Sequence, residues 1–261
     1  MSAAILYDST LCVGCRECEK ACAARWKLPY DERIAAEEQI SAHKLTAIQT
    51  RGEKFTRRLC MHCEDPTCAS VCPVGAFQKT ALGPVIYDQT KCIGCRYCML
   101  ACPFQVPTYE WTSRAPRVRK CDMCYDRLAQ GKPTACTEAC PVGATICGDR
   151  ASLVAEAQRR FSEKPDQYYH KIYGLHEAGG TSVLYLSSVP FEQLGMSTKV
   201  PGEPLPALTW RALSLVPDVV TTGGVLLGGI WWITHRRERV AAEERAEKRA
   251  AEKRTKEGSN Q

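Results

Sequence analysis

The sequence predicts an α+β fold in which one small module of short strands and helices occurs twice and is followed by one C-terminal transmembrane helix. Three observations predict it: most of the cysteines form repeated groups, the segments around these groups repeat within the chain, and a long apolar stretch lies near the C-terminus. The cysteine groups and the repeat indicate the two modules, and the apolar stretch indicates the membrane helix.

Sixteen of the seventeen cysteines fall into four groups of four. The groups are Cys12, Cys15, Cys18 and Cys22; Cys60, Cys63, Cys68 and Cys72; Cys92, Cys95, Cys98 and Cys102; and Cys121, Cys124, Cys136 and Cys140. The first and third have the spacing C-x2-C-x2-C-x3-C, which ligates [4Fe–4S] clusters in bacterial ferredoxins. A proline follows the last cysteine of the other two groups and of the third, as in that run. Four groups therefore predict four [4Fe–4S] clusters.

Two other uses of cysteine are less consistent with this pattern. A disulfide framework suits small secreted domains, whereas this chain has 261 residues and an odd number of cysteines. Structural zinc prefers two separated C-x2-C pairs, and only the fourth group has that form. The repetition of the groups favours iron–sulfur clusters over both.

The chain also repeats itself around the cysteines. Residues 5–16 match residues 85–96, and residues 66–76 match residues 133–144. Each unit reads as a short apolar strand, a cysteine loop with a glycine, a brief helix that carries the fourth cysteine, and a turn. This is the order of elements in a bacterial-ferredoxin-like module used twice, which we place in residues 1–150.

Five further residues beside the cysteines are candidates for a role at the clusters. Gly14 and Gly94 are expected to let backbone amides approach a cluster, although they could also serve as turn residues. Arg16 and Arg96 could offset the clusters' negative charge or be ordinary surface arginines. His62, within the second group, is expected to pack or hydrogen-bond beside a cluster rather than ligate it, because the thiolates are already sufficient.

The remaining segments of the soluble part are interpreted from composition and periodicity. Residues 23–59 hold a long charged stretch without cysteine, so we expect a surface insertion that is partly helical. Residues 151–195 are predicted to contain a helix, Ala151 to Ser162, and a strand, Ser182 to Ser187. Cys147 is left over and stands in an apolar context, which is typical of a buried free thiol.

One stretch, residues 212–234, is long and apolar enough to cross a bilayer and is apolar around its whole circumference. Residues 196–211 are expected to link it to the modules, and residues 235–261 to form a basic, solvated helix that frays at its end. The positive-inside rule places this tail in the cytoplasm and the cluster modules on the periplasmic side of the inner membrane. Asp218 is the single charge in the stretch.

Charge and targeting signals restrict the function further. About half of the net charge of +6 lies in the C-terminal tail, and no basic stripe with interleaved aromatic residues is present, so no nucleic-acid partner is indicated. The first residues carry no export signal. We therefore expect the chain to fold in the cytoplasm and to be exported with a partner that carries the signal.

With these groups, repeats and apolar stretch, the sequence resembles the four-cluster iron–sulfur (beta) subunits of the respiratory formate dehydrogenase and hydrogenase-2-type family. It is also related to the electron-transfer subunits of the dimethyl sulfoxide reductase type. The resemblance includes residues 176–185, runs from about residue 3 to residue 235, and does not extend to the tail.

The resemblance implies a nested set of ligands. Cys12, Cys15 and Cys18 would share a cluster with Cys140, and Cys121, Cys124 and Cys136 one with Cys22; Cys60, Cys63 and Cys68 would pair with Cys102, and Cys92, Cys95 and Cys98 with Cys72. Some relatives lack the second cysteine of the third group and hold a [3Fe–4S] cluster there. Cys95 is present, so we expect four [4Fe–4S] clusters.

The resemblance also implies a function. The chain would anchor a respiratory complex and relay electrons from a catalytic molybdenum or tungsten subunit of the formate dehydrogenase type to a cytochrome b or another quinone-reactive membrane subunit. Two alternatives remain, the same relay in a nickel–iron hydrogenase and a reductase complex with reversed flow. No set of residues suited to bond-making chemistry is found in the sequence, so we expect the chain not to be an enzyme itself.

Overall fold

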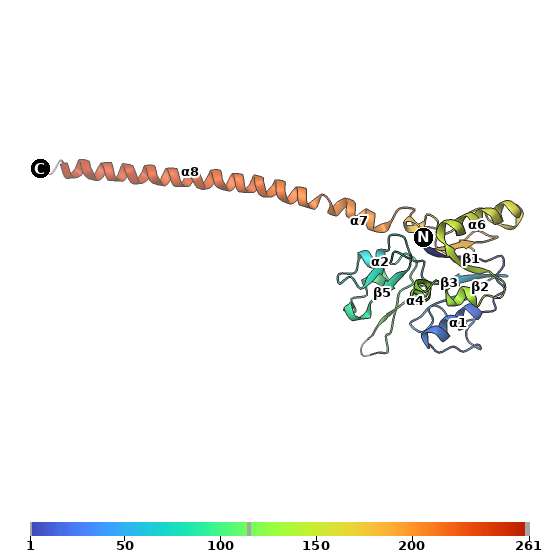
Figure 1. Ribbon diagram of the computed structural model, residues 1–261. Coiled ribbons are helices and arrows are strands. Elements are labelled where there is room, and N and C mark those ends of the chain that lie inside the picture. The colour runs from blue at the N-terminus through green and yellow to red at the C-terminus, as the bar shows by residue number, and fades with distance from the viewer. Residues whose placement is uncertain (1, 114–115, 259–261) are drawn as a thin grey trace. The chain divides into compact units, whose positions relative to one another are not determined.

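The computed structural model describes residues 2–113 and 116–258, and the chain divides into two compact units, Met1–Ala207 and Leu208–Gln261 (Figure 1). The larger unit contains both cysteine modules. Each module has one antiparallel pair of strands and one pair of helices in contact.

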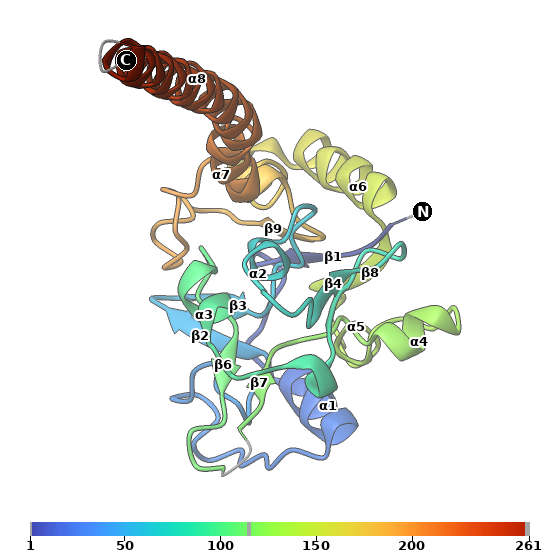
Figure 2. The same ribbon diagram turned by 90° about the vertical axis from the view of Figure 1, so that its left-hand side faces the viewer.

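The first module is built around β1 (Ala3–Asp8), the central strand of a three-stranded sheet. β1 pairs antiparallel with β8 (Thr145–Asp149) and parallel with β9 (Val183–Leu186). On one side of the module, α1 (Glu17–Trp26) contacts α5 (Ala135–Glu138), although more than a hundred residues separate them (Figure 2).

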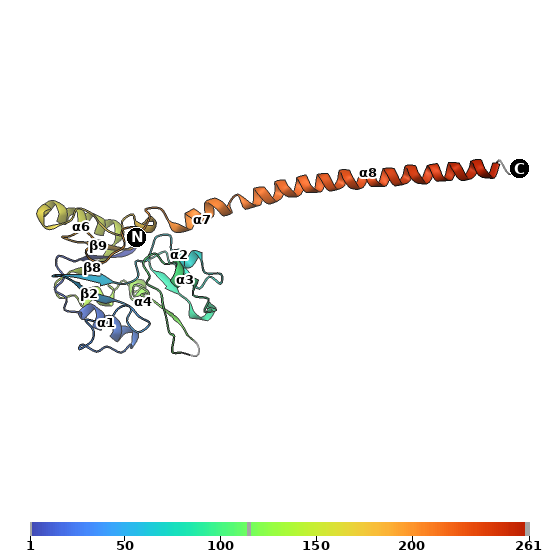
Figure 3. The same cartoon turned by 180° about the vertical axis from the view of Figure 1, so that it is seen from behind.

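The second module repeats this arrangement on a smaller scale. β5 (Val85–Tyr87) pairs antiparallel with β4 (Phe77–Lys79). α3 (Tyr97–Ala101) contacts α2 (Thr67–Ser70), and Figure 3 shows these two helices side by side. A short 3₁₀ turn, Gln89–Lys91, follows β5. β5 thus corresponds to β1, β4 to β8, α3 to α1 and α2 to α5. The predicted α+β fold with two modules is confirmed.

The segment that we expected on the surface, residues 23–59, is instead partly in the core. β2 (Ala47–Arg51) and β3 (Lys54–Arg58) form a hairpin whose tight turn has Gly52 at a positive φ of 59°. Ile48 belongs to the main hydrophobic core. The helical part is limited to residues 23–26 at the end of α1, because the described residues between α1 and β2 contain only turns, bends and one isolated bridge.

Three smaller elements connect the two modules. β6 (Thr108–Tyr109) and β7 (Val118–Arg119) pair antiparallel, and α4 (Tyr125–Ala129) follows the first two cysteines of the fourth group. The first module is therefore completed by residues on both sides of the second in the sequence.

The predicted helix after the modules is α6 (Arg150–Glu163), which extends the expected range by one residue at each end. Its first turn is capped by Asp149, whose carboxylate accepts a hydrogen bond from the Ala151 N–H at 3.1 Å. Leu153 and Ala157 lie on its buried face, in a core cluster shared with β1 and β9. Short 3₁₀ turns follow at Pro165–Gln167 and Glu177–Gly179.

The C-terminal part contains α7 (Leu205–Leu213) and α8 (Val216–Gly258). The end of the expected linker is therefore helical, and the expected span of residues 212–234 crosses a helix break. Pro217 explains the break, because proline has no N–H to donate to Leu213 and its ring clashes with that carbonyl. By length and composition, this helical region can cross a membrane, with a mean hydropathy of 1.5 over its most apolar window.

Candidate iron–sulfur centres

The cysteine loops of the first and third groups have the same backbone. Gly14 and Gly94 have φ of 69° and 74°, and Arg16 and Arg96, with φ of 60° and 64°, are the left-handed residues that start α1 and α3. Alternation of right- and left-handed residues turns successive N–H groups to one side and forms a concavity that binds anions. The loops thus suit a negatively charged cluster.

Each of these loops continues into a helix, and two more cysteines lie on that helix or at its end. Cys18 and Cys22 are four residues apart on α1, so they lie on the same face. Cys98 lies on α3, and Cys102 caps its C-terminal end. The fourth cysteine of each group is therefore displaced from the loop by one helical turn.

Backbone and hydroxyl donors reach several of the sulfurs. The N–H groups of Ala76, Gly94, Met123 and Ala135 donate to the Sγ atoms of Cys72 (3.2 Å), Cys92 (3.4 Å), Cys121 (3.2 Å) and Cys124 (3.4 Å). The Thr134 hydroxyl lies 3.3 Å from the Cys136 sulfur. Hydrogen bonds to the sulfurs are one of the means by which proteins set cluster potentials.

The first module brings Cys22 to the fourth group. Burial, and then the neighbouring thiols of Cys136 and Cys124, raise the pKa of Cys22 to about 12. Burial also raises the pKa of Cys121, and Cys22 makes the next largest contribution. Cys140 follows α5, which contacts α1.

In the second module, Cys102 lies near the second group and Cys72 near the third. Burial raises the pKa of Cys63, and the thiols of Cys60, Cys102 and Cys68 add to this effect. Burial likewise raises the pKa of Cys98 to about 11, with contributions from Cys92, Cys95 and Cys72. Such thiols are protonated without metal, so metal binding displaces protons from them.

Four of the cysteines, Cys60, Cys63, Cys68 and Cys102, line one small hollow of about 20 Å³, together with His62, Thr67 and Lys120. His62 is fully buried, and its Nδ1 accepts a hydrogen bond from the Val85 N–H at 2.9 Å. Burial, and then Lys120 and Lys79, lower the pKa of His62 well below its usual value, so the ring is neutral and carries its hydrogen on Nε2.

Two buried polar atoms in the wall of this hollow, His62 Nε2 and Thr67 Oγ1, have no hydrogen-bond partner in the part of the chain that the structure describes. Unpaired buried donors are costly, so their presence here fits a group that offers acceptor sulfurs. Within the described residues, no three His, Cys, Asp or Glu side chains lie close enough to hold a single metal ion. A cubane differs in this respect, because its four thiolates bind four different irons.

The two arginines predicted beside the clusters have different surroundings. Arg16 is partly buried and donates from Nη1 to the Gly14 carbonyl at 3.2 Å, within its own loop. Arg96 is exposed, and its guanidinium lies over the rings of Tyr109 and Trp111, with 5.6 and 5.2 Å to the ring centroids. This contact is a cation–π interaction.

Two buried cations near the cysteines were not singled out from the sequence. Arg57 on β3 is 1% exposed and Lys120 is 7% exposed. Lys120 donates from Nζ to the carbonyls of Cys121, at 2.9 Å, and Val85. Nothing in the sequence distinguishes Arg57 from the next residue, Arg58. Only the tertiary packing of the hairpin buries Arg57 and leaves Arg58 partly exposed.

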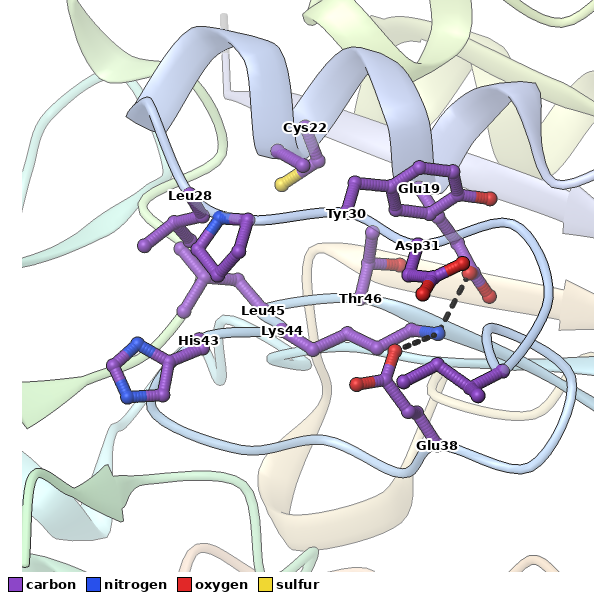
Figure 4. A pocket seen from close by; sticks show the side chains of 13 residues that line it. Glu19, Cys22, Leu28, Tyr30, Asp31, Glu38, His43, Lys44, Leu45 and Thr46 are labelled. Carbon is purple, nitrogen blue, oxygen red and sulfur yellow. Dashed lines mark hydrogen bonds and ion pairs between the residues drawn. The ribbon is translucent and has the colours of Figure 1, made fainter.

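A pocket next to Cys22 is shown in Figure 4. The Lys44 ammonium lies inside it and forms ion pairs with Glu19 at 2.8 Å and Glu38 at 3.3 Å. Its walls come from α1 and from the segment before β2. The ion pairs in this pocket stabilise the side of the module that carries Cys22.

Comparison with known proteins agrees with this geometry. Residues 8–76 and residues 50–150 each match a family described as 4Fe-4S dicluster domain. The chain is 41% identical over 257 residues to a protein of Nitratidesulfovibrio vulgaris, covering 93% of this chain and 70% of that one. It is 37% identical over 241 residues to the Hydrogenase-2 operon protein HybA of Escherichia coli O157:H7, covering 75% and 73%.

A third relative is the nitrate-inducible formate dehydrogenase iron-sulfur subunit of Escherichia coli strain K12, at 34% identity over 198 residues, 69% of this chain and 66% of the relative. These findings define a protein that binds [4Fe–4S] clusters in dicluster domains. The chain belongs to the family of iron–sulfur subunits of oxidoreductase complexes that includes these relatives.

Proposed function

We propose that this chain is the electron-transfer and membrane-anchoring subunit of a membrane-bound respiratory oxidoreductase, and that it holds four [4Fe–4S] clusters. The observation that carries the proposal is the nested pair of modules, in which four sets of cysteines gather on two copies of the same scaffold. The apolar C-terminal helix supports the anchoring role.

The ligand sets that we propose are those implied by the family. The first set is Cys12, Cys15, Cys18 and Cys140; the second Cys121, Cys124, Cys136 and Cys22; the third Cys60, Cys63, Cys68 and Cys102; and the fourth Cys92, Cys95, Cys98 and Cys72. Electrostatic contacts between the thiols support the last three sets, and the contact between α1 and α5 supports the first.

The contacts between sets support one order along the chain of centres. Cys18 of the first set interacts with Cys136 of the second, Cys121 of the second with Cys60 of the third, and Cys68 of the third with Cys98 of the fourth. Clusters bound at these sets would supply one-electron transfer. The burial of the cysteines in the two middle sets would exclude water from the inner two centres.

The first and fourth sets are the ones that can meet partners. They contain Cys15 and Cys95, which are exposed, whereas no cysteine of the two middle sets is. We propose that the first set receives electrons from a catalytic subunit and that the fourth passes them to a quinone-reactive membrane subunit such as a cytochrome b. The flow is reversed if the complex is a reductase.

The catalytic partner is either a molybdenum or tungsten formate dehydrogenase subunit or a nickel–iron hydrogenase. The match to the hydrogenase-2 operon protein covers more of both chains than the formate dehydrogenase match, and this favours the hydrogenase. The complex, purified anaerobically, is assayed for quinone reduction with formate and with hydrogen. Activity with neither donor contradicts both assignments.

The ligand sets can be tested on the full chain with Cys22→Ser and, as a matched control, Cys147→Ser. Four cubanes give about sixteen iron atoms per chain. We expect Cys22→Ser to alter the electron paramagnetic resonance signal of the second set alone and Cys147→Ser to alter none. A wild-type chain with about four iron atoms, or a Cys22 variant that loses the first set, overturns the assignment.

We also propose that the cluster modules lie on the periplasmic side of the inner membrane and the C-terminus in the cytoplasm. The basic residues that follow the apolar part of α8 support this orientation. A reporter enzyme that works only in the cytoplasm is expected to be active when it is fused to the C-terminus. Periplasmic activity contradicts the orientation.

A further inference from the structure

Arg57 is buried more deeply than any other charged side chain of comparable size in the described part of the chain. It is 1% exposed and lies on β3, within the hairpin beside the first module. Burial of a charge is strongly unfavourable unless an opposite charge or several hydrogen bonds compensate it. The position of Arg57 therefore requires a compensating group.

The neutral contacts of Arg57 are not sufficient for this. Its Nε donates to the Thr46 hydroxyl at 3.0 Å, and its Nη1 donates to the Thr145 hydroxyl at 2.9 Å. Among the ion pairs of the described residues, none joins Arg57 to an Asp or Glu carboxylate. Hydroxyl groups supply hydrogen bonds but no negative charge.

The elements around Arg57 carry cysteines from two different ligand sets. Arg57 is opposite Ile48 in the hairpin, and the Ile48 N–H donates to the carboxylate of Glu19, the residue next to Cys18. Thr145, which accepts a hydrogen bond from Arg57, belongs to β8, and β8 contacts α5, the helix that carries Cys136. The Arg57 guanidinium accordingly interacts with the sulfurs of Cys136 and Cys18.

Arg57 therefore lies at the junction of the first and second sets. We propose that Arg57 is a positioning residue that serves as the shared positive counter-charge of these two centres and raises the reduction potentials of both. The inference rests on the ligand sets proposed above. Reduction adds a negative charge to a centre, and a nearby buried cation stabilises the more negative state.

A purely structural role has different consequences. The bonds to Thr46 and Thr145 tie the hairpin to β8, and any side chain that breaks them loosens the module. A structural residue affects cluster loading and stability but does not depend on charge. Reduction potentials in charge-conserving and charge-removing variants separate the two roles.

The experiment uses the full-length chain with loaded clusters, purified anaerobically, and the variants Arg57→Lys and Arg57→Gln. Arg58→Gln is the matched control, because Arg58 is the next residue and its guanidinium donates to the Phe104 carbonyl at 3.2 Å and the Gly195 carbonyl at 3.4 Å, away from these sets. Iron content and redox titrations followed by electron paramagnetic resonance are measured for each protein.

We expect Arg57→Gln to lower the equilibrium constant for reduction about tenfold at the first and second of the four centres. This corresponds to a fall of ~59 mV in each reduction potential for one electron. Arg57→Lys and Arg58→Gln are expected to stay near wild type. If Arg57→Gln loads fully and all four potentials are unchanged, or if Arg57→Lys shifts them as Arg57→Gln does, the inference is overturned.

Loss of clusters is also informative. If Arg57→Gln fails to load the first two sets while Arg57→Lys loads them, the counter-charge is supported. If both variants lose the same centres, Arg57 acts through its shape and hydrogen bonds, and the inference is overturned. Failure of the wild-type chain to hold about sixteen iron atoms is a different result, because it refutes the proposed ligand sets and with them the inference that rests on them. The outcomes above, obtained with a fully loaded wild-type chain, overturn the role of Arg57 alone.

Discussion

Lys44 and Glu19 form an ion pair of 2.8 Å between two side chains that are 7% and 1% exposed (Figure 4). Glu19 lies on α1 between Cys18 and Cys22, and it also accepts a hydrogen bond from the Ile48 N–H. Lys44 donates to the Ala35 carbonyl at 2.7 Å. The pair thus fastens the cysteine-bearing helix to the segment that leads into β2.

The first prediction concerns this pair. Lys44→Met leaves the Glu19 carboxylate buried without its partner, and breaking a buried ion pair costs about 3–5 kcal/mol. We expect a loss of this size in the free energy of unfolding, measured with denaturant on the full chain. Lys20→Met is the control, because the Lys20–Glu32 pair has the same 2.8 Å distance but is exposed. An equal loss in both variants contradicts the role of burial.

The second prediction uses the internal repeat. Asp8 and Asp88 are equivalent, and each accepts the N–H of the residue two positions on at 2.9 Å. Only Asp8 is fully buried, where it also accepts from Arg160 at 2.8 Å and from the Tyr168 hydroxyl at 2.7 Å. We expect Asp8→Asn to lower the free energy of unfolding by about 3 kcal/mol.

Asp88→Asn changes the equivalent position, where 41% of the side chain is exposed, and is expected to have little effect. The measurement is again denaturant unfolding of the two variants side by side. If the two substitutions lower the free energy of unfolding equally, the hydrogen bond within the loop accounts for the loss, and the buried network around Asp8 contributes nothing to stability.

The third prediction concerns Gly14. A Cβ at this position would lie 2.4 Å from the Phe55 ring, and its φ of 69° is already unfavourable for a side chain. We expect Gly14→Ala to reduce the iron content of the purified chain by one cluster. Gly75→Ala is the control, since Gly75 also has a positive φ but open space around its Cβ position. Similar iron contents in both variants refute the steric explanation.

The fourth prediction concerns the membrane anchor. A chain that ends at Pro204 lacks α7 and α8, and we expect it to move from the membrane to the soluble fraction when expressed without partners. A chain that ends at Val240 keeps the apolar part of α8 and is expected to stay in the membrane fraction. Retention of the shorter chain in the membrane shows that the cluster modules bind the bilayer by themselves.

The cysteine loops could be predicted because the spacing of ligands within one loop is a local property of the chain. The same holds for α6, whose apolar periodicity and Asp149 cap are written in consecutive residues. The burial of β2 and β3 is decided by long-range packing, and a charged segment gives no local sign of it. Arg57 is the clearest case, because its neighbours come from three distant segments.

The helix break before Val216 shows a different reason for error. Mean hydropathy over a window does not respond to a single proline, so the expected span ran through residues 212–234 without interruption. Pro217 did carry the information, since its missing N–H ends α7 at Leu213. The position of the residue without a backbone N–H, Pro217, predicts the break correctly.

The nested connectivity has a consequence for biogenesis. All ligands proposed for the second module lie between Cys60 and Cys102, whereas those of the first module extend from Cys12 to Cys140. During synthesis the inner pair of binding sites can close while the outer cysteines still wait for the strand β8 and its preceding loop. Closing a longer loop costs more entropy, so the first module is expected to close around its clusters after the second. The early cysteines of the first module must therefore stay unoxidised until the last ones emerge.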